Sequence, residues 1–276
     1  MSARAPGEVA KRLLQAWDTA SLAPLPSADP GGLDLPEAWR VAGELLDSRL
    51  ARGEAVAGWK IGFTNRSIWD RYGVHAPIWG PVWKAGVTQL EGDEATLSLA
   101  GLCQPRLEPE IVFGFAQAPR AGMDLCALRG CIGWVAHGLE IVHTHYADWR
   151  FTAADTVADF ALHGRLLVGP RVEVNNWETL ADDLGALRLT LSEGGEPRDA
   201  GQGCVVLDGP LHALRHWLDA MAVHTPGWPV EAGHVVTTGT ITDAWPLTAG
   251  QVWRTTLEVP GAQGRGLRGL TLRVGP

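Results

Sequence analysis

Hydrophobic residues recur at helical spacing near the start of the chain and give way to shorter, strand-like runs further on. Residues 7–20 predict a helix, because apolar side chains such as Leu13 and Trp17 fall on one face. A linker rich in Pro, Gly and Asp follows, and Asp34 is the expected N-cap of a second helix. These two elements predict an N-terminal helical portion over residues 1–54.

From residue 55 onward, short apolar runs bounded by turn residues are typical of strands, with a few helices between them. This pattern predicts an α+β protein whose main domain spans residues 55–276. The expected strands lie near 55–64, 87–90, 95–99, 111–113, 138–142, 166–174, 187–192, 204–206, 235–240, 253–259 and 267–274. The expected helices in this part lie near 65–73, 124–136, 155–163, 176–184 and 208–222.

Two glutamates interrupt the apolar stretch from Gln104 to Phe113. The end of this stretch, Ile111-Val112-Phe113, is β-branched or aromatic and predicts a strand. Because strand side chains alternate, Glu108 and Glu110 point to one face, roughly 7 Å apart at the backbone. Two acids in an apolar segment need water, a counter-charge or a metal ion, since an unpaired buried charge is too costly. The plain alternative is a half-exposed strand with a solvated acidic face.

Pro109 lies between these two glutamates and predicts where their strand sits. Proline has no N–H group to donate to a strand ladder, so within sheets it is confined to edge strands and bulges. We therefore expect an edge strand or a bulge at this position, where a ligand can approach.

A single lysine lies inside another predicted strand. Lys60 is flanked by Trp59 and Ile61, with Gly58 and Gly62 beyond them. The glycines would let a ligand or another backbone come close. A partly buried ammonium is a useful proton donor, because burial can lower its pKa. The alternative is that the lysine reaches the surface or pairs with a nearby acid.

A third acid, Glu140, also lies in an apolar run and needs a partner. With Glu108 and Glu110 it would form a site made of oxygen ligands, which suits Mg²⁺ or Mn²⁺ and disfavours zinc. His143 and His145 follow closely and are rival ligands, although single histidines near a strand end are more often structural.

Composition narrows the class of protein. Of the 276 residues, 46% are hydrophobic, which is enough for a sizeable core. The net charge of −8 argues against a general nucleic-acid surface. No apolar run approaches the roughly 20 residues of a membrane span, and we expect no signal peptide. The four cysteines show no CxxC spacing, so we expect a reduced, cytoplasmic protein without zinc or a disulfide framework.

Several short motifs can be read together. They are Gly58-Trp59-Lys60-Ile61-Gly62, Gln104-Pro105-Arg106-Leu107-Glu108-Pro109-Glu110-Ile111, Leu139-Glu140, Asp155-Thr156-Val157-Ala158-Asp159, Thr238-Gly239 and Ala249-Gly250. Together they resemble the 2-keto-4-pentenoate hydratase and 4-oxalocrotonate decarboxylase family of the fumarylacetoacetate hydrolase superfamily. The E-x-E pair followed by a third glutamate is fairly specific for the superfamily. The lysine and the DTVAD segment indicate the hydratase/decarboxylase branch of this superfamily.

This resemblance, which runs from about the second helix to the last strand, implies a fold, a cofactor and a set of site residues. The fold is a mixed β-roll of the fumarylacetoacetase C-terminal type, surrounded by helices. Members use Mg²⁺ or Mn²⁺, act on small 2-oxo acids and form homo-oligomers, and we expect no nucleic-acid or membrane partner. By position, the metal ligands are Glu108, Glu110 and Glu140, and the acid/base residue is Lys60. The implied substrate-binding residues are Gln104, Asp159, His163 and Thr238.

The implied activity is a metal-dependent lyase reaction on 2-oxo or 2-hydroxydienoate acids in aromatic-compound catabolism. Ile78 stands where many hydratases have Asp and decarboxylases often have Ile, which favours decarboxylation. Asp159-Phe160-Ala161-Leu162 replaces the common D-N-A-S, so a small polar group is lost. We expect His163, the next residue, to face the pocket in its place. Asp208-Gly209-Pro210-Leu211 replaces the usual G-H-P-L, which implies a bulkier or differently charged substrate.

Two other functions stay open at this point. One is a C–C hydrolase of the acylpyruvate or fumarylacetoacetate type, since the far end of the pocket, not the metal site, selects the reaction. The other is a relative that binds a metal ion and dicarboxylates without turnover, which the loss of the D-N-A-S polar group suggests and Lys60 argues against. The sequence leaves open the substrate, the metal, the number of subunits and the roles of His75, His143 and His145.

Overall fold

Helices and strands are interspersed along the chain, and the structure, a computed structural model, describes residues 6–261 and 266–276. The α-helices are α1 (Pro6–Thr19), α2 (Leu35–Ala51), α3 (Trp69–Tyr72), α4 (Leu125–Cys131), α5 (Ala153–Ala158), α6 (Leu180–Ala186) and α7 (Pro210–His224). The strands are β1 (Val56–Gly62), β2 (Ile78–Trp83), β3 (Val87–Gln89), β4 (Glu94–Leu97), β5 (Arg106–Phe115), β6 (Ile132–Val142), β7 (His163–Val168), β8 (Val172–Glu173), β9 (Arg188–Glu193), β10 (Glu196–Gln202), β11 (Val235–Thr237), β12 (Trp245–Pro246), β13 (Val252–Glu258) and β14 (Thr271–Val274).

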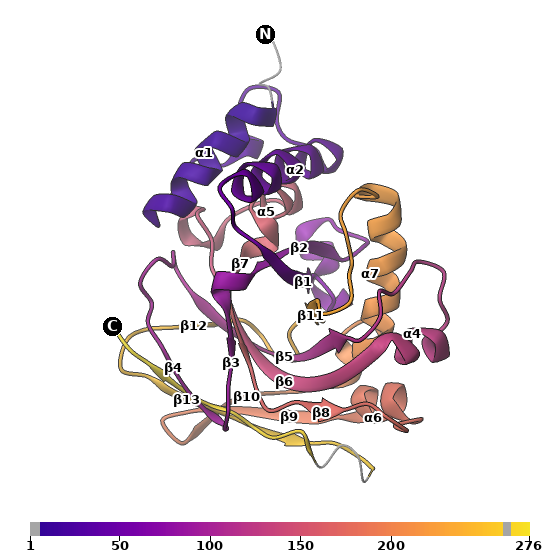
Figure 1. Cartoon of the computed structure of the whole chain (residues 1–276). Helices are drawn as coiled ribbons and strands as arrows, with labels where there is room; N and C mark the ends of the chain where they lie inside the picture. Colours follow the sequence, from indigo (N-terminus) through magenta and orange to yellow (C-terminus); the bar gives the residue numbers. More distant parts are fainter. Residues whose placement is uncertain (1–5, 262–265) are drawn as a thin grey trace.

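The strands form two sheets. In the described part of the chain, the larger sheet has nine strands with the order β2-β1-β11-β5-β6-β7-β3, while β12 pairs with β5 and β8 pairs with β6. The smaller sheet has five strands with the order β10-β9-β13-β14-β4. Figure 1 shows α1, α2 and α5 at one end of the molecule and the smaller sheet at the other, with α4, α6 and α7 along one side.

The N-terminal helices form where the sequence predicts them. The side chain of Asp34 caps α2 by accepting the backbone N–H of Glu37 at 2.8 Å. Buried residues of α1 and α2 belong to the same apolar core as the large sheet, so a domain boundary at residue 54 stays a prediction. Among the described residues, no helix is long and apolar enough to cross a membrane.

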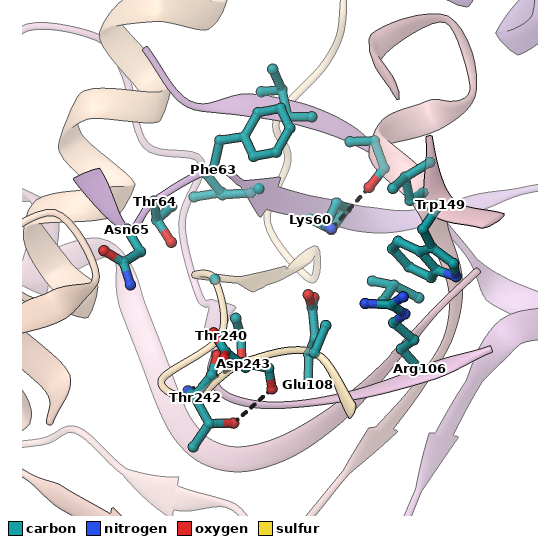
Figure 2. A pocket seen from close by; sticks show the side chains of 18 of the residues that line it. Lys60, Phe63, Thr64, Asn65, Arg106, Glu108, Trp149, Thr240, Thr242 and Asp243 are labelled. Atoms are coloured by element: carbon teal, nitrogen blue, oxygen red, sulfur yellow. Dashed lines mark hydrogen bonds between the residues drawn. The ribbon is translucent and has the colours of Figure 1, made fainter. Parts of the chain in front are cut away.

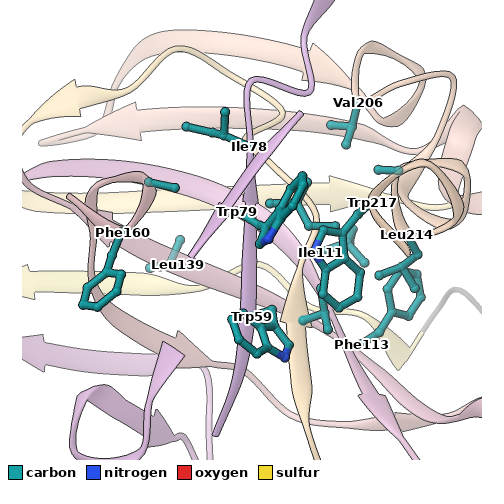
Figure 3. Packing of buried hydrophobic residues seen from close by; sticks show 14 of the residues in the cluster. Trp59, Ile78, Trp79, Ile111, Phe113, Leu139, Phe160, Val206, Leu214 and Trp217 are labelled. Atoms are coloured by element: carbon teal, nitrogen blue, oxygen red, sulfur yellow. The ribbon is translucent and has the colours of Figure 1, made fainter. Parts of the chain in front are cut away.

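Tryptophan supplies much of the volume of this core. The chain has 13 tryptophans, and Trp59, Trp79 and Trp217 are among its largest fully buried side chains. In Figure 3 they lie with Ile111 and Phe113 of β5, between the sheet and α7. Fully buried aromatic rings bury a large apolar area, so packing accounts for these tryptophans.

β5 separates two environments, as its alternating pattern predicts. Leu107, Ile111 and Phe113 pack in the main apolar core. Val112, on the opposite face, packs in a smaller apolar cluster with residues of β2, β6, β7 and β11. Glu108 and Glu110 share that second face, which the curved large sheet encloses.

The expectation of an edge strand or a bulge at Pro109 is wrong, because β5 lies between β11 and β6 and Pro109 pairs with Leu139 of β6 in regular register. β11 pairs with β5 up to Val112, and β12 pairs with it only from Leu107. Between them, the backbone N–H of Ile241 donates to the carbonyl oxygen of Pro109 at 3.0 Å. The nitrogen of Pro109 therefore faces this interruption in the ladder, where a strand donor is not required.

Several element boundaries also differ from the prediction. The helix expected over 124–136 ends at Cys131, and residues 132–136 already belong to β6, because their apolar side chains pair with β5. The segment 204–206 is not a strand; a 3₁₀ turn covers Gly203–Val205 instead. The hairpin around Gly194-Gly195 is confirmed, with β9 and β10 on its two sides.

Candidate active site

The three glutamates singled out by sequence lie together on neighbouring strands. Glu108 and Glu110 come from β5, and Glu140 comes from β6, where the strand register places it directly opposite Glu108. One carboxylate oxygen from each of the three lies within 4.8 Å of the others. Glu110 and Glu140 are fully buried, whereas Glu108 is half-buried. The arrangement follows from strand alternation and pairing alone.

Surrounding groups leave one carboxylate oxygen without a partner. The backbone N–H of Gly239 donates to Oε2 of Glu110 at 2.7 Å, and the Thr237 hydroxyl donates to Oε2 of Glu140 at 3.2 Å. Oε1 of Glu110 is buried and has no hydrogen-bond partner within the described residues. A buried acceptor of this kind requires a cation or a donor. The oxygen-only donor set fits a divalent cation such as Mg²⁺.

The clustered carboxylates shift one another's pKa values. Burial, followed by the charges of Glu140 and Glu108, raises the pKa of Glu110 well above its ordinary value. Burial raises the pKa of Glu108 to about 7, although Lys60 opposes the shift. Burial acts in the same direction on Glu140, but the Lys60 ammonium and a hydrogen bond to His163 lower its pKa to about 2. Protons are thus held in the cluster, and cation binding would release them because carboxylate ligands bind deprotonated.

Lys60 approaches the cluster from β1. Its Nζ donates to the carbonyl oxygen of Ala161 at 2.9 Å and lies 3.4 Å from Oε1 of Glu140. Burial acts to lower the pKa of Lys60, but the charges of Glu140, Glu108 and Glu110 raise it above its ordinary value. The alternative that Lys60 pairs with a nearby acid is therefore confirmed, and the lower pKa that burial alone could cause is not found.

A cavity of about 260 Å³ lies between Lys60 and Glu108. Figure 2 shows these two side chains pointing toward one another across it, with Arg106 and Trp149 on one side and Thr64 and Asn65 on the other. The guanidinium of Arg106 stacks 4.1 Å from the ring centre of Trp149. The rest of the wall comes from Ile61, Gly62, Phe63, Ile78, Val142, Phe151, Ala161, Leu162, Gly239, Thr240, Thr242, Asp243 and Ala244.

Gln104, one predicted substrate-binding residue, does not line this cavity. Its Nε2 donates to the carbonyl oxygens of Thr144 and Tyr146, at 3.1 and 2.8 Å, and its Oε1 accepts the backbone N–H of Asp148 at 2.9 Å. The indole N–H of Trp149 donates to the carbonyl oxygen of Gln104 at 3.0 Å. The side-chain amide therefore holds the loop that carries Trp149 to the cavity.

Asp159 and Thr238, two more predicted substrate-binding residues, also lie behind the cavity wall. Both carboxylate oxygens of Asp159 lie 2.9 Å from Nδ1 of His145. Thr238 is fully buried, and its hydroxyl donates to the carbonyl oxygen of Ile111 at 3.1 Å. Gly239, next to Thr238, and Ala161, two positions after Asp159, line the cavity in their place.

The expectation that His163 faces the pocket is wrong. His163 is 1% exposed, and its Nδ1 lies 2.7 Å from Oε1 of Glu140. The preceding turn places Ala161 and Leu162 on the cavity wall. His163 then begins β7 opposite Val142 of β6, so its ring reaches the neighbouring glutamate. The residue contacts a carboxylate of the cluster and not the cavity.

The rival ligands His143 and His145 lie apart from the carboxylates. Nδ1 of His143 accepts the backbone N–H of Cys103 at 3.2 Å, while His145 pairs with Asp159. Both rings contact Trp17 of α1, with ring centres 4.6 and 5.1 Å away. Within the described ranges, the three glutamates are the only group of three or more side chains placed to hold a metal ion.

Sequence reasoning missed some residues that shape the site. Thr237 and Gly239 follow one another closely at the end of β11, and both donate to the glutamates. Gly239 has φ of +104°, and a Cβ there would lie 1.8 Å from the hydroxyl of Thr64, so glycine is required. Arg106 was also missed, although strand alternation puts it on the same face as Glu108 and could have revealed it.

No family model matches the chain. A 2-hydroxyhexa-2,4-dienoate hydratase from Comamonas testosteroni is 32% identical over 255 residues, which cover 91% of this chain and 93% of the relative. A 2-keto-4-pentenoate hydratase from Paraburkholderia phymatum is 33% identical over 236 residues, covering 84% of this chain and 86% of the relative.

Among solved structures, a 4-oxalocrotonate decarboxylase from Pseudomonas putida G7, complexed with magnesium and adipate, has the same fold. Its TM-score is 0.86 at 23% identity, over 98% of this chain and 97% of that chain. The fold is thus of the fumarylacetoacetate hydrolase type, as predicted. The chain belongs to the family of 2-keto-4-pentenoate hydratases and 4-oxalocrotonate decarboxylases. The predictions of this family and of an enzyme are confirmed.

Proposed function

We propose that this protein is a divalent-cation-dependent lyase acting on small 2-oxo acids, or on their 2-hydroxydienoate enols, in aromatic-compound catabolism. One observation carries the proposal: three carboxylates with an unpartnered Glu110 oxygen form a cluster, and both Glu108 of this cluster and the buried Lys60 ammonium, 3.4 Å from Oε1 of Glu140, line the same cavity. The substrates named for the hydratases that resemble this chain support the dienoate class.

The proposed metal ligands are Glu108, Glu110 and Glu140, and the proposed ion is Mg²⁺ or Mn²⁺. Both ions prefer oxygen ligands, and all three side chains offer only oxygen. When bound there, such an ion supplies Lewis acidity toward the 2-oxygen of a 2-oxo acid. Gly239, Thr237 and His163 orient the carboxylates by hydrogen bonds, as groups behind metal ligands commonly do.

Lys60 is the proposed acid/base residue. Its Nζ lines the cavity and holds a proton that can be moved to or from the conjugated chain of the substrate. The Ala161 carbonyl oxygen fixes the direction of this ammonium. Arg106 brings a second positive charge to the wall and is the proposed contact for a substrate carboxylate, because guanidinium and carboxylate groups match in shape and charge.

The side chains near Lys60 favour decarboxylation over hydration. Ile78 and Leu162 both line the cavity with Lys60. The family resemblance implies Asp and Ser at these two positions in many relatives. Neither side chain can hold a water molecule by hydrogen bonding. Hydration is the reaction named for the relatives described above, so the product decides between the two lyase reactions.

A substrate panel tests the proposal. Purified protein with Mg²⁺ or Mn²⁺ is mixed with 2-hydroxypenta-2,4-dienoate, 2-hydroxyhexa-2,4-dienoate, 4-oxalocrotonate and an acylpyruvate. We expect loss of the ultraviolet absorbance of at least one dienoic acid, with CO₂ and a five-carbon acid as products for decarboxylation, or a 4-hydroxy-2-oxo acid for hydration. Turnover of the acylpyruvate alone would identify the protein as a C–C hydrolase and contradict the lyase. Binding of these acids without turnover would identify the protein as a non-catalytic relative and contradict the lyase.

We further propose that the protein works as a homo-oligomer in the cytoplasm. Its four cysteines are unpaired, which suits a reducing compartment. The oligomer is implied by the family resemblance, and size-exclusion chromatography with light scattering tests it. A mass of 29.6 kDa would identify a monomer and contradict the oligomer.

A further inference from the structure

The carbonyl group that holds Lys60 belongs to a turn with an unusual backbone. Phe160, Ala161 and Leu162 have φ values of 53°, 52° and 67°. This left-handed region favours glycine, and each L-residue there is strained. Three such residues in a row persist only where the surrounding structure holds them. Contacts on either side of the turn are therefore needed to keep the Ala161 carbonyl pointed at Lys60.

On one side, β2 packs directly against the turn. A Cβ at Gly80 would lie 2.1 Å from the carbonyl oxygen of Phe160, so β2 approaches this closely only because residue 80 is glycine. Gly80 is also the strand partner of Lys60. Phe160 is fully buried, and its ring centre lies 5.8 Å from that of Trp83. The turn thus rests on the same strand pair that carries the lysine.

On the other side, the carboxylate of Asp159 anchors the start of the turn. Its Oδ1 accepts the indole N–H of Trp17, in the N-terminal helix α1, at 2.9 Å. Both its oxygens also contact Nδ1 of His145 at 2.9 Å. The backbone carbonyl of Asp159 accepts the N–H of Leu162 at 3.0 Å and closes the turn.

We propose that Trp17 and Asp159 are positioning residues for Lys60, through the Ala161 carbonyl; the inference rests on the proposed acid/base role of Lys60. The indole N–H fixes Asp159, Asp159 fixes the left-handed turn, and the turn fixes the oxygen that receives the Nζ hydrogen bond. The N-terminal helical portion thereby contributes to catalysis without touching the cavity, whose wall contains no residue of α1 among those described. The proposed metal ligands lie on β5 and β6 and are not members of this chain of hydrogen bonds.

The test removes a single hydrogen bond. Trp17→Phe keeps an aromatic ring against His143 and His145 but loses the N–H donor. We expect kcat to fall roughly tenfold, because small displacements of a catalytic group reduce rate by one to two orders of magnitude. KM and Mn²⁺ affinity should stay within about twofold of the parent values. Trp39→Phe on α2 is the matched control, since the Trp39 ring stacks on Trp79 at 4.2 Å, whereas the indole donor to Asp159 is Trp17; it should leave kcat unchanged.

A double variant distinguishes a positioning role of Trp17 toward Lys60 from a general loss of packing around the site. If Trp17 acts through Lys60, then Trp17→Phe should not lower the residual rate of Lys60→Ala any further. An additional tenfold loss in that background would overturn the inference, as would an unchanged kcat in Trp17→Phe alone. Full activity of Lys60→Ala would instead refute the proposed acid/base role of Lys60, and absence of turnover in the parent protein would refute the lyase, so these failures are distinguishable.

A second variant covers the case in which Trp17→Phe does not fold. Ala161→Gly adopts the left-handed conformation without strain and leaves the carbonyl free to sample other directions. We expect an unchanged midpoint of thermal unfolding, an unchanged KM and a several-fold lower kcat. An unchanged kcat in this variant would overturn the inference.

Discussion

The site has two parts, a carboxylate side and a lysine side, which are built in different ways. On the carboxylate side, Glu108, Glu110 and Glu140 come from two adjacent antiparallel strands, and regular register brings them together. On the lysine side, Lys60 depends on a left-handed turn about 100 residues further along the chain, which in turn contacts α1. Local periodicity determines the first side and long-range contacts determine the second. Changes far from the cavity should therefore affect the lysine side more.

Removal of the proposed metal ion is expected to have the largest effect, and it acts through the three glutamates of the carboxylate side. Treatment with a chelator followed by desalting should abolish turnover, because the proposed Lewis acid is lost. Addition of Mg²⁺ or Mn²⁺ should restore it. Full activity of protein shown by elemental analysis to be metal-free would refute a metal centre at the three glutamates.

Lys60→Ala tests the opposite side. We expect kcat to fall by about 10² or more, the usual contribution of a positioned acid/base group. The protein should stay folded by circular dichroism, with Mn²⁺ still bound. Lys84→Ala, at an exposed lysine just after β2, serves as the control and should keep full activity. Loss of folding in Lys60→Ala alone would indicate a structural lysine.

His163→Ala tests whether the carboxylate side needs support from outside its two strands. Because His163 hydrogen-bonds Glu140, the variant should bind Mn²⁺ about 10- to 100-fold more weakly, the range for loss of a group behind a metal ligand. KM at saturating metal should not change. Isothermal titration calorimetry measures the Mn²⁺ affinity, and steady-state kinetics measures KM. His75→Ala, at an exposed histidine, is the control. A changed KM with unchanged metal affinity would indicate that His163 contacts the substrate and does not support the metal ligands.

The smallest effect is expected for a variant that lowers the stability of the N-terminal helices without changing their contact with the turn that holds Lys60. Asp34→Ala removes the N-cap of α2 and should lower the free energy of unfolding by about 1 kcal/mol. It leaves the contact between Trp17 and Asp159 in place, so kcat should be unchanged. Urea unfolding and steady-state kinetics measure both quantities. A large loss of kcat would mean that general loosening of the N-terminal helices is enough to impair the site.

Strand alternation explains why the neighbourhood of the glutamates could be predicted. Glu108 and Glu110 are two residues apart, so any extended backbone places them on one face. An acid in each of two apolar strands also predicts that the strands bring the acids together, since neither can be buried alone. The N-cap at Asp34 and the hairpin at Gly194-Gly195 were predictable for the same reason, because each depends on a few consecutive residues.

The remaining features depend on contacts that the linear sequence does not display. Pro109 indicated an edge strand, yet it sits in a central strand, because β11 and β12 leave an interruption beside it. His163 was expected in the pocket, yet the turn before it directs its ring to Glu140. The pKa of Lys60 rises where burial alone would lower it, because the glutamates of two other strands surround it.

The sequence by itself determined the α+β composition, the shared face of Glu108 and Glu110, and the presence of a lysine in an apolar strand, because short-range periodicity and burial costs act within single elements. Only the tertiary structure decided which groups meet Lys60, where the histidines point and how α1 reaches the turn. The hydrogen bonds among them join residues that are between 14 and 142 positions apart. Their geometry depends on how whole sheets and helices pack, which no local pattern specifies.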